Sequence, residues 1–279
     1  MMAVHLAIFL VCFVATSVWC YVIWGQKYLL EKRRVAHHAK PLSSQQLHLL
    51  NRAMPLYRRL PPTLQKQLSG HIQVFLAEKH FVGGDGLVVD DNMRLVVAAN
   101  ACLLLLNRHS DNFINVKTIV LYPGAYRAKQ QHQHNQIVSD VEQTRLGESW
   151  PWGTVVLSWS DSLAGSINEQ DGHNVILHEF SHQLDQQNGG ATGTPKLKER
   201  AMYQQWNKVL SQEYQQLRSQ LWQNKSSVID TYGATNEAEF FAVITESFFE
   251  RPLQLRKEHS ALYEILYRYY QVDPVSWFR

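Results

Sequence analysis

The sequence predicts an α+β domain that follows a single N-terminal transmembrane helix. Three features support this prediction: a long apolar run near the N-terminus, two short strand-like segments in the middle of the chain, and helical patterns around them. A small sheet followed by a helical half favours an α+β arrangement over a doubly wound one. The 279 residues are 45% hydrophobic and 18% charged, a globular composition that excludes a disordered tail, a collagen and a coiled-coil rod.

The apolar run covers residues 3–24 and contains no Lys, Arg, Asp or Glu. As a helix it would be about 33 Å long, enough to cross a hydrocarbon core of about 30 Å. A cleaved signal peptide would need a basic segment before a shorter apolar core, and no Lys or Arg precedes this run. We therefore interpret residues 3–24 as an uncleaved anchor in the lipid bilayer.

The charges that flank the anchor predict its orientation. Five basic residues follow the run, and positive charge near a span is retained on the cytoplasmic side (Lys27, Lys32, Arg33, Arg34 and Lys40). We expect a single-pass protein whose main domain faces the cytoplasm. The net charge of +3 is weak and its basic excess is mostly beside the membrane, so nucleic acid is not an expected partner.

We divide the chain into an anchor at residues 1–26, a juxtamembrane helical segment at 27–80 and a main domain at 81–279. Leucines at helical spacing predict packing helices between residues 43 and 76, interrupted at Pro61 and Pro62. A glycine-rich turn at 83–86 precedes an expected short strand at 87–89, and residues 92–106 are expected to form a buried helix.

The two clearest strands are residues 117–122 (KTIVLY) and 154–159 (TVVLSW). An exposed sheet edge can accept an extended segment as an added strand. We expect the strand at 154–159 to be such an edge strand, although its Val155-Val156-Leu157 run would also suit the centre of a sheet.

A His-Glu-x-x-His motif lies at residues 178–182 (HEFSH). On a helix, His178 and His182 are one turn apart, so both imidazoles can reach one metal ion while Glu179 projects toward a metal-bound water. The neighbouring residues are apolar, a poor environment for unpaired imidazoles and carboxylates. The motif therefore predicts a hydrolytic zinc site in which Glu179 is the general base. We expect the edge strand at 154–159 to lie beside this site, where an extended peptide substrate can pair with it.

Catalytic zinc usually has three protein ligands and one open position, so a third ligand must come from elsewhere. The helix predicted at 236–249 (NEAEFFAVITESFF) carries Glu239 and Glu246 seven residues apart on one face. Glu239 also matches a capping box with Asn236, and Glu199 lies closer to the motif but in a polar stretch. From the residues alone, Glu239 and Glu246 are equal candidates and Glu199 ranks behind them.

Ligating imidazoles usually donate their second N–H to a carboxylate or a carbonyl. Asp185 lies one helical turn beyond His182, and Glu246 lies two turns beyond Glu239. Either acid can orient a histidine, and each is equally consistent with a buried salt bridge.

Several segments together resemble the Mlc titration factor family of bacterial zinc peptidases (residues 93–106, 119–123, 147–159, HEFSHQLD and NEAEFFAVITESFF). The catalytic part is also similar to the peptidase domain of lethal-factor type toxins. The resemblance implies a zincin-like fold with one zinc ion per chain, and it makes Glu239 the third ligand. It also implies that Tyr232, seven residues before that ligand, donates a hydrogen bond to the oxyanion.

Together these features predict a zinc metallopeptidase anchored in a bacterial inner membrane, which hydrolyses peptide bonds by a zinc-activated water. Its expected partners are a peptide or protein substrate and the bilayer. The family also suggests a regulatory protein partner. The alternative is a membrane-tethered regulator that sequesters a partner such as a transcriptional repressor, with slow or incidental hydrolysis.

Overall fold

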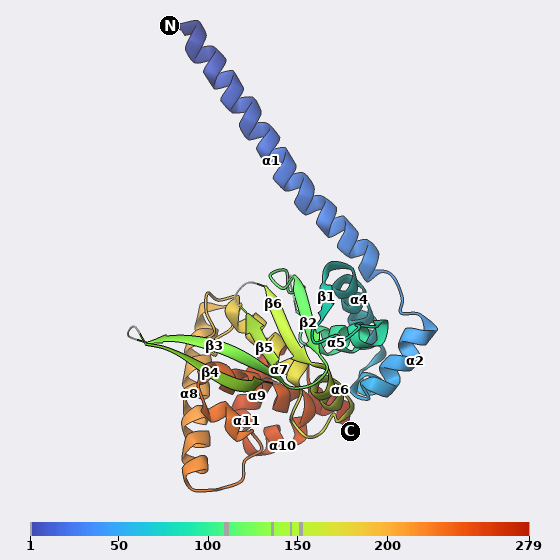
Figure 1. Ribbon diagram of the computed structural model, residues 1–279, viewed down its shortest axis with the longest axis vertical. Helices are drawn as coiled ribbons and strands as arrows, with labels where there is room; N and C mark the ends of the chain where they lie inside the picture. The colour runs from blue at the N-terminus through green and yellow to red at the C-terminus, as the bar shows by residue number, and fades with distance from the viewer. Residues whose placement is uncertain (1, 109–111, 135–136, 146, 151–152, 279) are drawn as a thin grey trace.

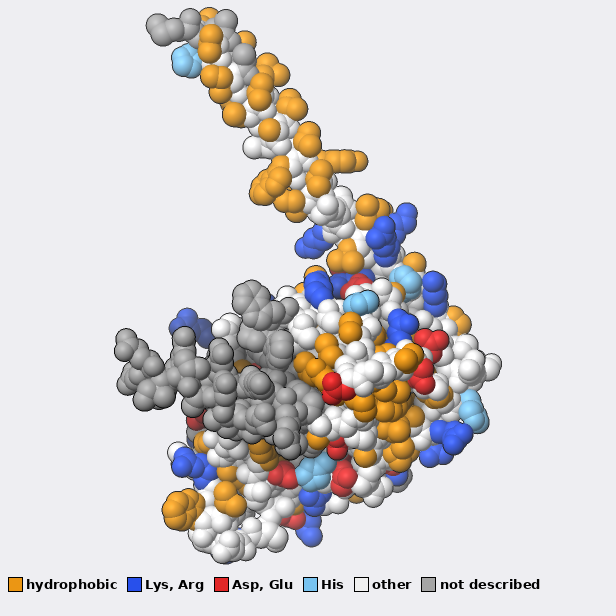
Figure 2. Space-filling model, in the orientation of Figure 1, with side chains coloured by type: hydrophobic (Ala, Val, Ile, Leu, Met, Phe, Trp, Pro, Cys, Tyr) orange, Lys and Arg blue, Asp and Glu red, His pale blue; other side chains and the backbone are white. Residues whose placement is uncertain are grey.

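The computed structural model describes residues 2–108, 112–134, 137–145, 147–150 and 153–278. Helix α1 (Met2–His38) projects from a rounded domain that contains all the other elements (Figure 1). Its segment Val4–His38 is long and apolar enough to cross a membrane, and its most apolar part is not buried against the domain. Figure 2 shows hydrophobic side chains along this helix and basic ones where it approaches the domain. These features indicate single-pass membrane anchoring.

Helix α1 continues past residue 26 and docks onto the domain. The Arg34 guanidinium forms two hydrogen bonds with the Glu78 carboxylate, at 2.7 and 2.9 Å. The His38 ring lies so close to Gly70 that a Cβ atom there would come within 2.5 Å of it. Arg34 is buried, so the last turns of α1 are fixed against helix α4 (Pro62–Glu78).

Two helices precede α4, namely α2 (Ser44–Ala53) and α3 (Leu56–Arg59). The Ser43 side chain caps α2, and α4 begins at Pro62, where a proline needs no N–H partner. Their apolar faces join the same hydrophobic core as helix α5 (Asp91–Leu103), which is buried as expected. A single core therefore extends across residue 80, on both sides of the domain boundary suggested by the sequence.

The main sheet contains four strands in the order β1-β2-β6-β5 (His80–Gly83, Thr118–Tyr122, Thr154–Ser158 and Gly147–Trp150). Strands β1, β2 and β6 are parallel, and β5 is antiparallel to β6. Thr118 pairs with Thr154, and Leu157 pairs with both Leu121 and Gly147. A separate hairpin joins β3 (Tyr126–His134) to β4 (Ile137–Arg145).

Strand β6 is central, so the prediction that it forms the edge was wrong. It pairs with β2 on one side and β5 on the other, which agrees with its buried Val155-Val156-Leu157 run. The edge on this side is β5, which contacts helix α7 (Val175–Gln186).

The strand predicted at residues 87–89 is not present in the structure, which describes this segment completely. Strand β1 lies before the glycine turn, where it pairs with β2, and no strand follows that turn before α5.

The second half of the chain is helical. Helix α6 (Trp159–Ile167) follows β6 directly, and α7 is followed by α8 (Arg200–Trp222). The 3₁₀ helix η1 (Thr231–Ala234) leads into α9 (Glu237–Glu250), and α10 (Pro252–Glu258), α11 (Ser260–Tyr270) and η2 (Pro274–Phe278) complete the chain. Phenylalanines of α9 pack on tyrosines of α11, with ring centroids 5.1 Å apart for Phe249 and Tyr270. A small sheet and a predominantly helical half confirm the α+β prediction.

Candidate metal centre

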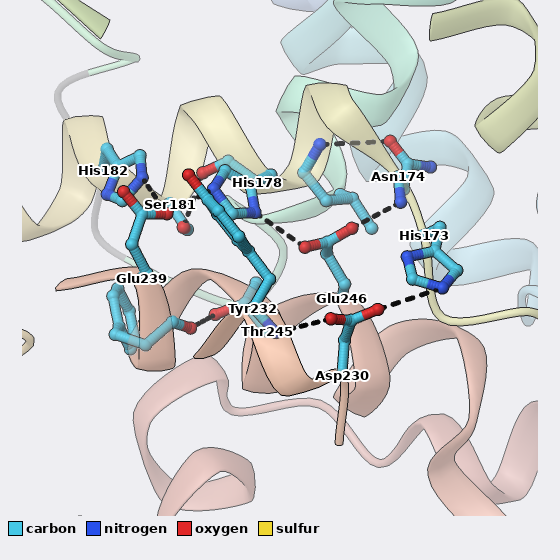
Figure 3. A network of polar contacts seen from close by, with 12 residues as sticks. His173, Asn174, His178, Ser181, His182, Asp230, Tyr232, Glu239, Thr245 and Glu246 are labelled. Atoms are coloured by element: carbon cyan, nitrogen blue, oxygen red, sulfur yellow. Dashed lines mark hydrogen bonds and ion pairs between the residues drawn. The ribbon is translucent and has the colours of Figure 1, made fainter. Parts of the chain in front are cut away.

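The candidate site lies between α7 and α9, which run side by side (Figure 3). Each helix begins at an asparagine cap: Asn174 Oδ1 accepts the Leu177 N–H at 3.1 Å, and Asn236 Oδ1 accepts the Glu239 N–H at 2.9 Å. These caps fix the first turns, where the site residues begin. The Asn236 cap is therefore present, but the Glu239 carboxylate points to the two histidines of α7.

Three side chains converge between the helices. His178, His182 and Glu239 each offer one ligand atom, and these atoms all lie within 4.8 Å of one another. Glu239 Oε2 is 2.9 Å from His178 Nε2 and 3.5 Å from His182 Nε2. It is the only such group of three or more His, Cys, Asp or Glu side chains within the described parts of the chain.

The surroundings of this group suit a bound cation. Burial alone lowers the pKa of His178, but the Glu246 and Glu239 carboxylates outweigh it and raise that pKa well above its ordinary value. The same field acts in favour of any positive charge placed between the helices. Two imidazole nitrogens and one carboxylate oxygen are also a common ligand set that leaves a coordination position open, so these residues fit a catalytic metal.

Glu246 holds His178 in place from the side opposite Glu239. Its Oε1 lies 2.7 Å from His178 Nδ1, and its Oε2 accepts the Asn174 N–H at 2.5 Å. A carboxylate bonded to the second nitrogen of a ligating imidazole fixes the tautomer and the ring orientation. Glu246 thus links the His178 imidazole to Asn174, the N-cap residue of the same helix.

Glu179 is buried beside the two histidines. Burial raises the pKa of its carboxyl group, while His178 and His182 lower it in part. A raised pKa brings a carboxylate nearer to the range in which it exchanges protons efficiently at neutral pH.

Tyr232 lies in η1, close to the group. Its ring centroid is 5.9 Å from that of His178, and its side chain is 55% exposed. Asp230 Oδ1 accepts the Tyr232 N–H at 2.6 Å, and Asp230 Oδ2 is 3.3 Å from His173 Nε2 (Figure 3). The turn that carries Tyr232 is therefore fastened to the loop before α7.

Two other acids predicted as possible site residues are not among the three converging side chains. Glu199 is exposed at the N-cap of α8 and does not join the group. Asp185 is fully buried, and its Oδ2 accepts the Gly193 N–H at 2.7 Å, so it anchors the loop after α7. Among the described residues, no ion pair joins Asp185 to a histidine.

Two residues of this region were not predicted from the sequence. Asn174 donates to Asn100 and to Glu250, each at 3.0 Å, and caps α7 at the same time. Its position before an apolar run is a recognisable cap signal. Glu250 is buried, and burial raises the pKa of its carboxyl group well above the ordinary value. The sequence offers no local signal for it, because its partners come from distant segments.

Comparison with known proteins agrees with this geometry. The profile of the glucose-regulated metallo-peptidase M90 family matches residues 29–271. An uncharacterized protein of Synechocystis sp. is 42% identical over 255 residues, covering 91% of this chain and 93% of the relative. Mlc titration factor A of Serratia proteamaculans is 30% identical over 228 residues, covering 80% and 86%. The protein of that name from Klebsiella pneumoniae is 29% identical over 231 residues, covering 81% and 86%.

The family profile spans most of the chain, and the relatives are covered along most of their own length. Both findings confirm the resemblance to Mlc titration factors noted from the sequence, and a metallopeptidase family implies a metal ion. The chain therefore belongs to the glucose-regulated metallo-peptidase M90 family.

Proposed function

We propose that this protein is a membrane-anchored zinc peptidase that binds one zinc ion through His178, His182 and Glu239. The observation that supports this most directly is the convergence of three ligand atoms within 4.8 Å of one another. A buried glutamate beside them completes the set of groups that peptide hydrolysis needs.

Zinc held by this ligand set would lower the pKa of a water molecule and polarise the scissile carbonyl. Glu179 accepts the proton of the attacking water and then delivers it to the leaving amine. The Tyr232 hydroxyl donates a hydrogen bond to the carbonyl oxygen as it gains negative charge. Glu246 keeps the His178 imidazole oriented while these charges shift.

We propose β5 as the strand that receives the substrate. Within the described residues β5 pairs only with β6, and it contacts α7, which carries two of the three proposed ligands. An extended peptide can pair with a free strand edge through main-chain hydrogen bonds. Strand β5 thus takes the role that the sequence predicted for the strand at 154–159, because pairing with a peptide requires a strand at the edge of the sheet.

We further propose that α1 crosses a bacterial inner membrane with the domain on the cytoplasmic side. The basic residues after the span support this orientation.

The substitution Glu179→Gln tests the catalytic proposal, because it removes the base without removing a proposed ligand. The variant should keep its zinc and its melting temperature but lose nearly all turnover of a peptide library. Glu258→Gln is a matched control, since Glu258 is exposed at the end of α10 and is not one of the three converging side chains. Turnover in Glu179→Gln that equals turnover in Glu258→Gln would refute the role of Glu179.

A second function is favoured by the relatives named Mlc titration factor A, whose name indicates that they titrate a protein called Mlc. In this alternative the domain binds a regulatory protein partner, and hydrolysis is slow or incidental. A binding protein has no need of the base, so partner binding that survives Glu179→Gln, together with no measurable turnover in the wild type, would favour it.

A further inference from the structure

A second potential site lies at the C-terminal end of α7, outside the metal centre. A cavity of about 300 Å³ lies between the last turn of α7, the loop before α8, the first turn of α8 and the end of α11. Leu184, Leu197 and Met202 supply apolar walls, and Gln187 and Gln271 supply amide groups. The volume is within the range of small-molecule sites.

The charged groups that line this cavity are all cationic: Arg108, Lys196, Lys198 and Arg268. Lys196 and Lys198 are exposed, and neither forms a hydrogen bond or an ion pair with any described residue. Arg268 forms an ion pair with Glu264, with 2.9 Å between Arg268 Nε and Glu264 Oε1. The cavity therefore gathers four cationic side chains, with the Glu264 carboxylate on Arg268 and the buried Asp185 carboxylate near the lining residue Tyr269.

Arg108 is the most firmly placed of these cations. Its guanidinium carbon lies 4.1 Å from the centroid of the Tyr269 ring, and its Nη1 is 3.5 Å from the Leu104 carbonyl oxygen. Among the described residues, no carboxylate pairs with it. A guanidinium stacked on a ring keeps most of its N–H groups available for a planar anion.

The cavity and the metal centre lie on different faces of α7. Leu184 follows His182 by two residues, which corresponds to a rotation of about 200° around the helix axis. His182 points to Glu239 on α9, whereas Leu184 lines the cavity. A ligand in the cavity would thus contact the metal-binding helix without reaching the metal.

We propose that this cavity binds a small organic dianion. Unpaired cations around one concave surface raise the local concentration of anions, and charge-assisted hydrogen bonds from Arg108, Lys196 and Lys198 would hold the charged groups. The apolar walls accommodate a short carbon skeleton. Phosphate monoesters and dicarboxylates share this chemistry.

The test is a calorimetric titration of the full-length protein in an uncharged detergent at low ionic strength. Glycerol 2-phosphate and succinate are the two probes, and they distinguish a phosphate ligand from a dicarboxylate. Saturable binding of either, with a dissociation constant of about 1 mM or tighter, is the expected result. Binding of neither would overturn the proposal, and would leave the cations as partners of the negative end of α7.

Two double variants separate a built site from general charge attraction. K196Q/K198Q should weaken binding about tenfold, and K196R/K198R should preserve it. K66Q/K225Q removes the same charge from exposed lysines outside the cavity and should leave the affinity unchanged. An equal loss in K66Q/K225Q, or an unchanged affinity in K196Q/K198Q, would overturn the proposal.

Discussion

The substitution Glu246→Gln tests how the candidate metal centre is held together. Glu246 accepts from two donors at once, His178 Nδ1 at 2.7 Å and the Asn174 N–H at 2.5 Å. Glutamine has the same shape but only one acceptor oxygen. Whichever way its amide is turned, an NH₂ group faces a donor, so either His178 loses its orienting partner or α7 loses a contact at its cap.

The magnitude follows from the burial of this contact. The Glu246 side chain is only 7% exposed, so water cannot replace the missing acceptor. A buried hydrogen bond to a charged group contributes about 1.5–3 kcal/mol, and loss of a partner of a ligating imidazole typically weakens metal binding about 10- to 100-fold. We therefore expect zinc affinity to fall by one to two orders of magnitude.

Zinc affinity is measured by competition with a chelator of known affinity, using full-length protein in detergent. Glu258→Gln is the matched control, because it makes the same chemical change at an exposed position. A zinc affinity in Glu246→Gln within about twofold of the control would refute the orienting role assigned to Glu246.

Three further results are expected. Burial raises the pKa of Glu250, so above about pH 4.5 the folded protein retains a proton that the unfolded chain releases. The free energy of unfolding should therefore fall as the pH rises above about 4.5. Glu250→Gln should remove this dependence and raise the melting temperature at pH 7. Burial lowers the pKa of Lys79 to about 8 from 10.5, so between these pH values the unfolded chain holds a proton that the folded protein has released. The free energy of unfolding should therefore rise by up to about 3 kcal/mol as the pH increases from 8 to 10.5, and Lys79→Met should abolish this rise. Tyr232→Phe should lower turnover roughly a hundredfold at unchanged zinc content, and near-normal turnover would remove its oxyanion role.

The local part of the site could be predicted from the sequence. The spacing of His178 and His182 is set by one helical turn, so the motif itself specifies that both imidazoles share a face. The choice between Glu239 and Glu246 was different, because residues seven apart share a helix face and local spacing cannot separate them. In the structure both contact His178, Glu239 at Nε2 and Glu246 at Nδ1. Glu239 and Glu246 are equal candidates in the sequence because they share a helix face, from which their carboxylates contact the two different nitrogens of the same His178 imidazole.

Long-range pairing limited the prediction of the sheet. The sequence located strands β2 and β6 because their apolar runs are bounded by proline and glycine. The neighbours of β6 depend on β5, a four-residue strand with the sequence GESW and no clear alternation. A strand that short is specified by its partner, so the edge could not be assigned from local pattern.

The cavity beside α7 was beyond sequence reasoning for the same reason. Its cations are Arg108, Lys196, Lys198 and Arg268, which come from three segments separated by tens of residues. No local motif joins them, and only the packing of α11 and the loop before α8 against α7 brings them together.

The central claim is that His178, His182 and Glu239 bind one catalytic zinc ion, and the zinc content of purified variants tests it most directly. The measurement compares zinc per chain in the wild type, Glu239→Ala and Glu199→Ala, because Glu199 is the exposed acid nearest to the motif among the alternatives. The account predicts about one zinc per chain in the wild type and in Glu199→Ala, and loss of zinc in Glu239→Ala. Zinc retained in Glu239→Ala, or lost in Glu199→Ala instead, would contradict it.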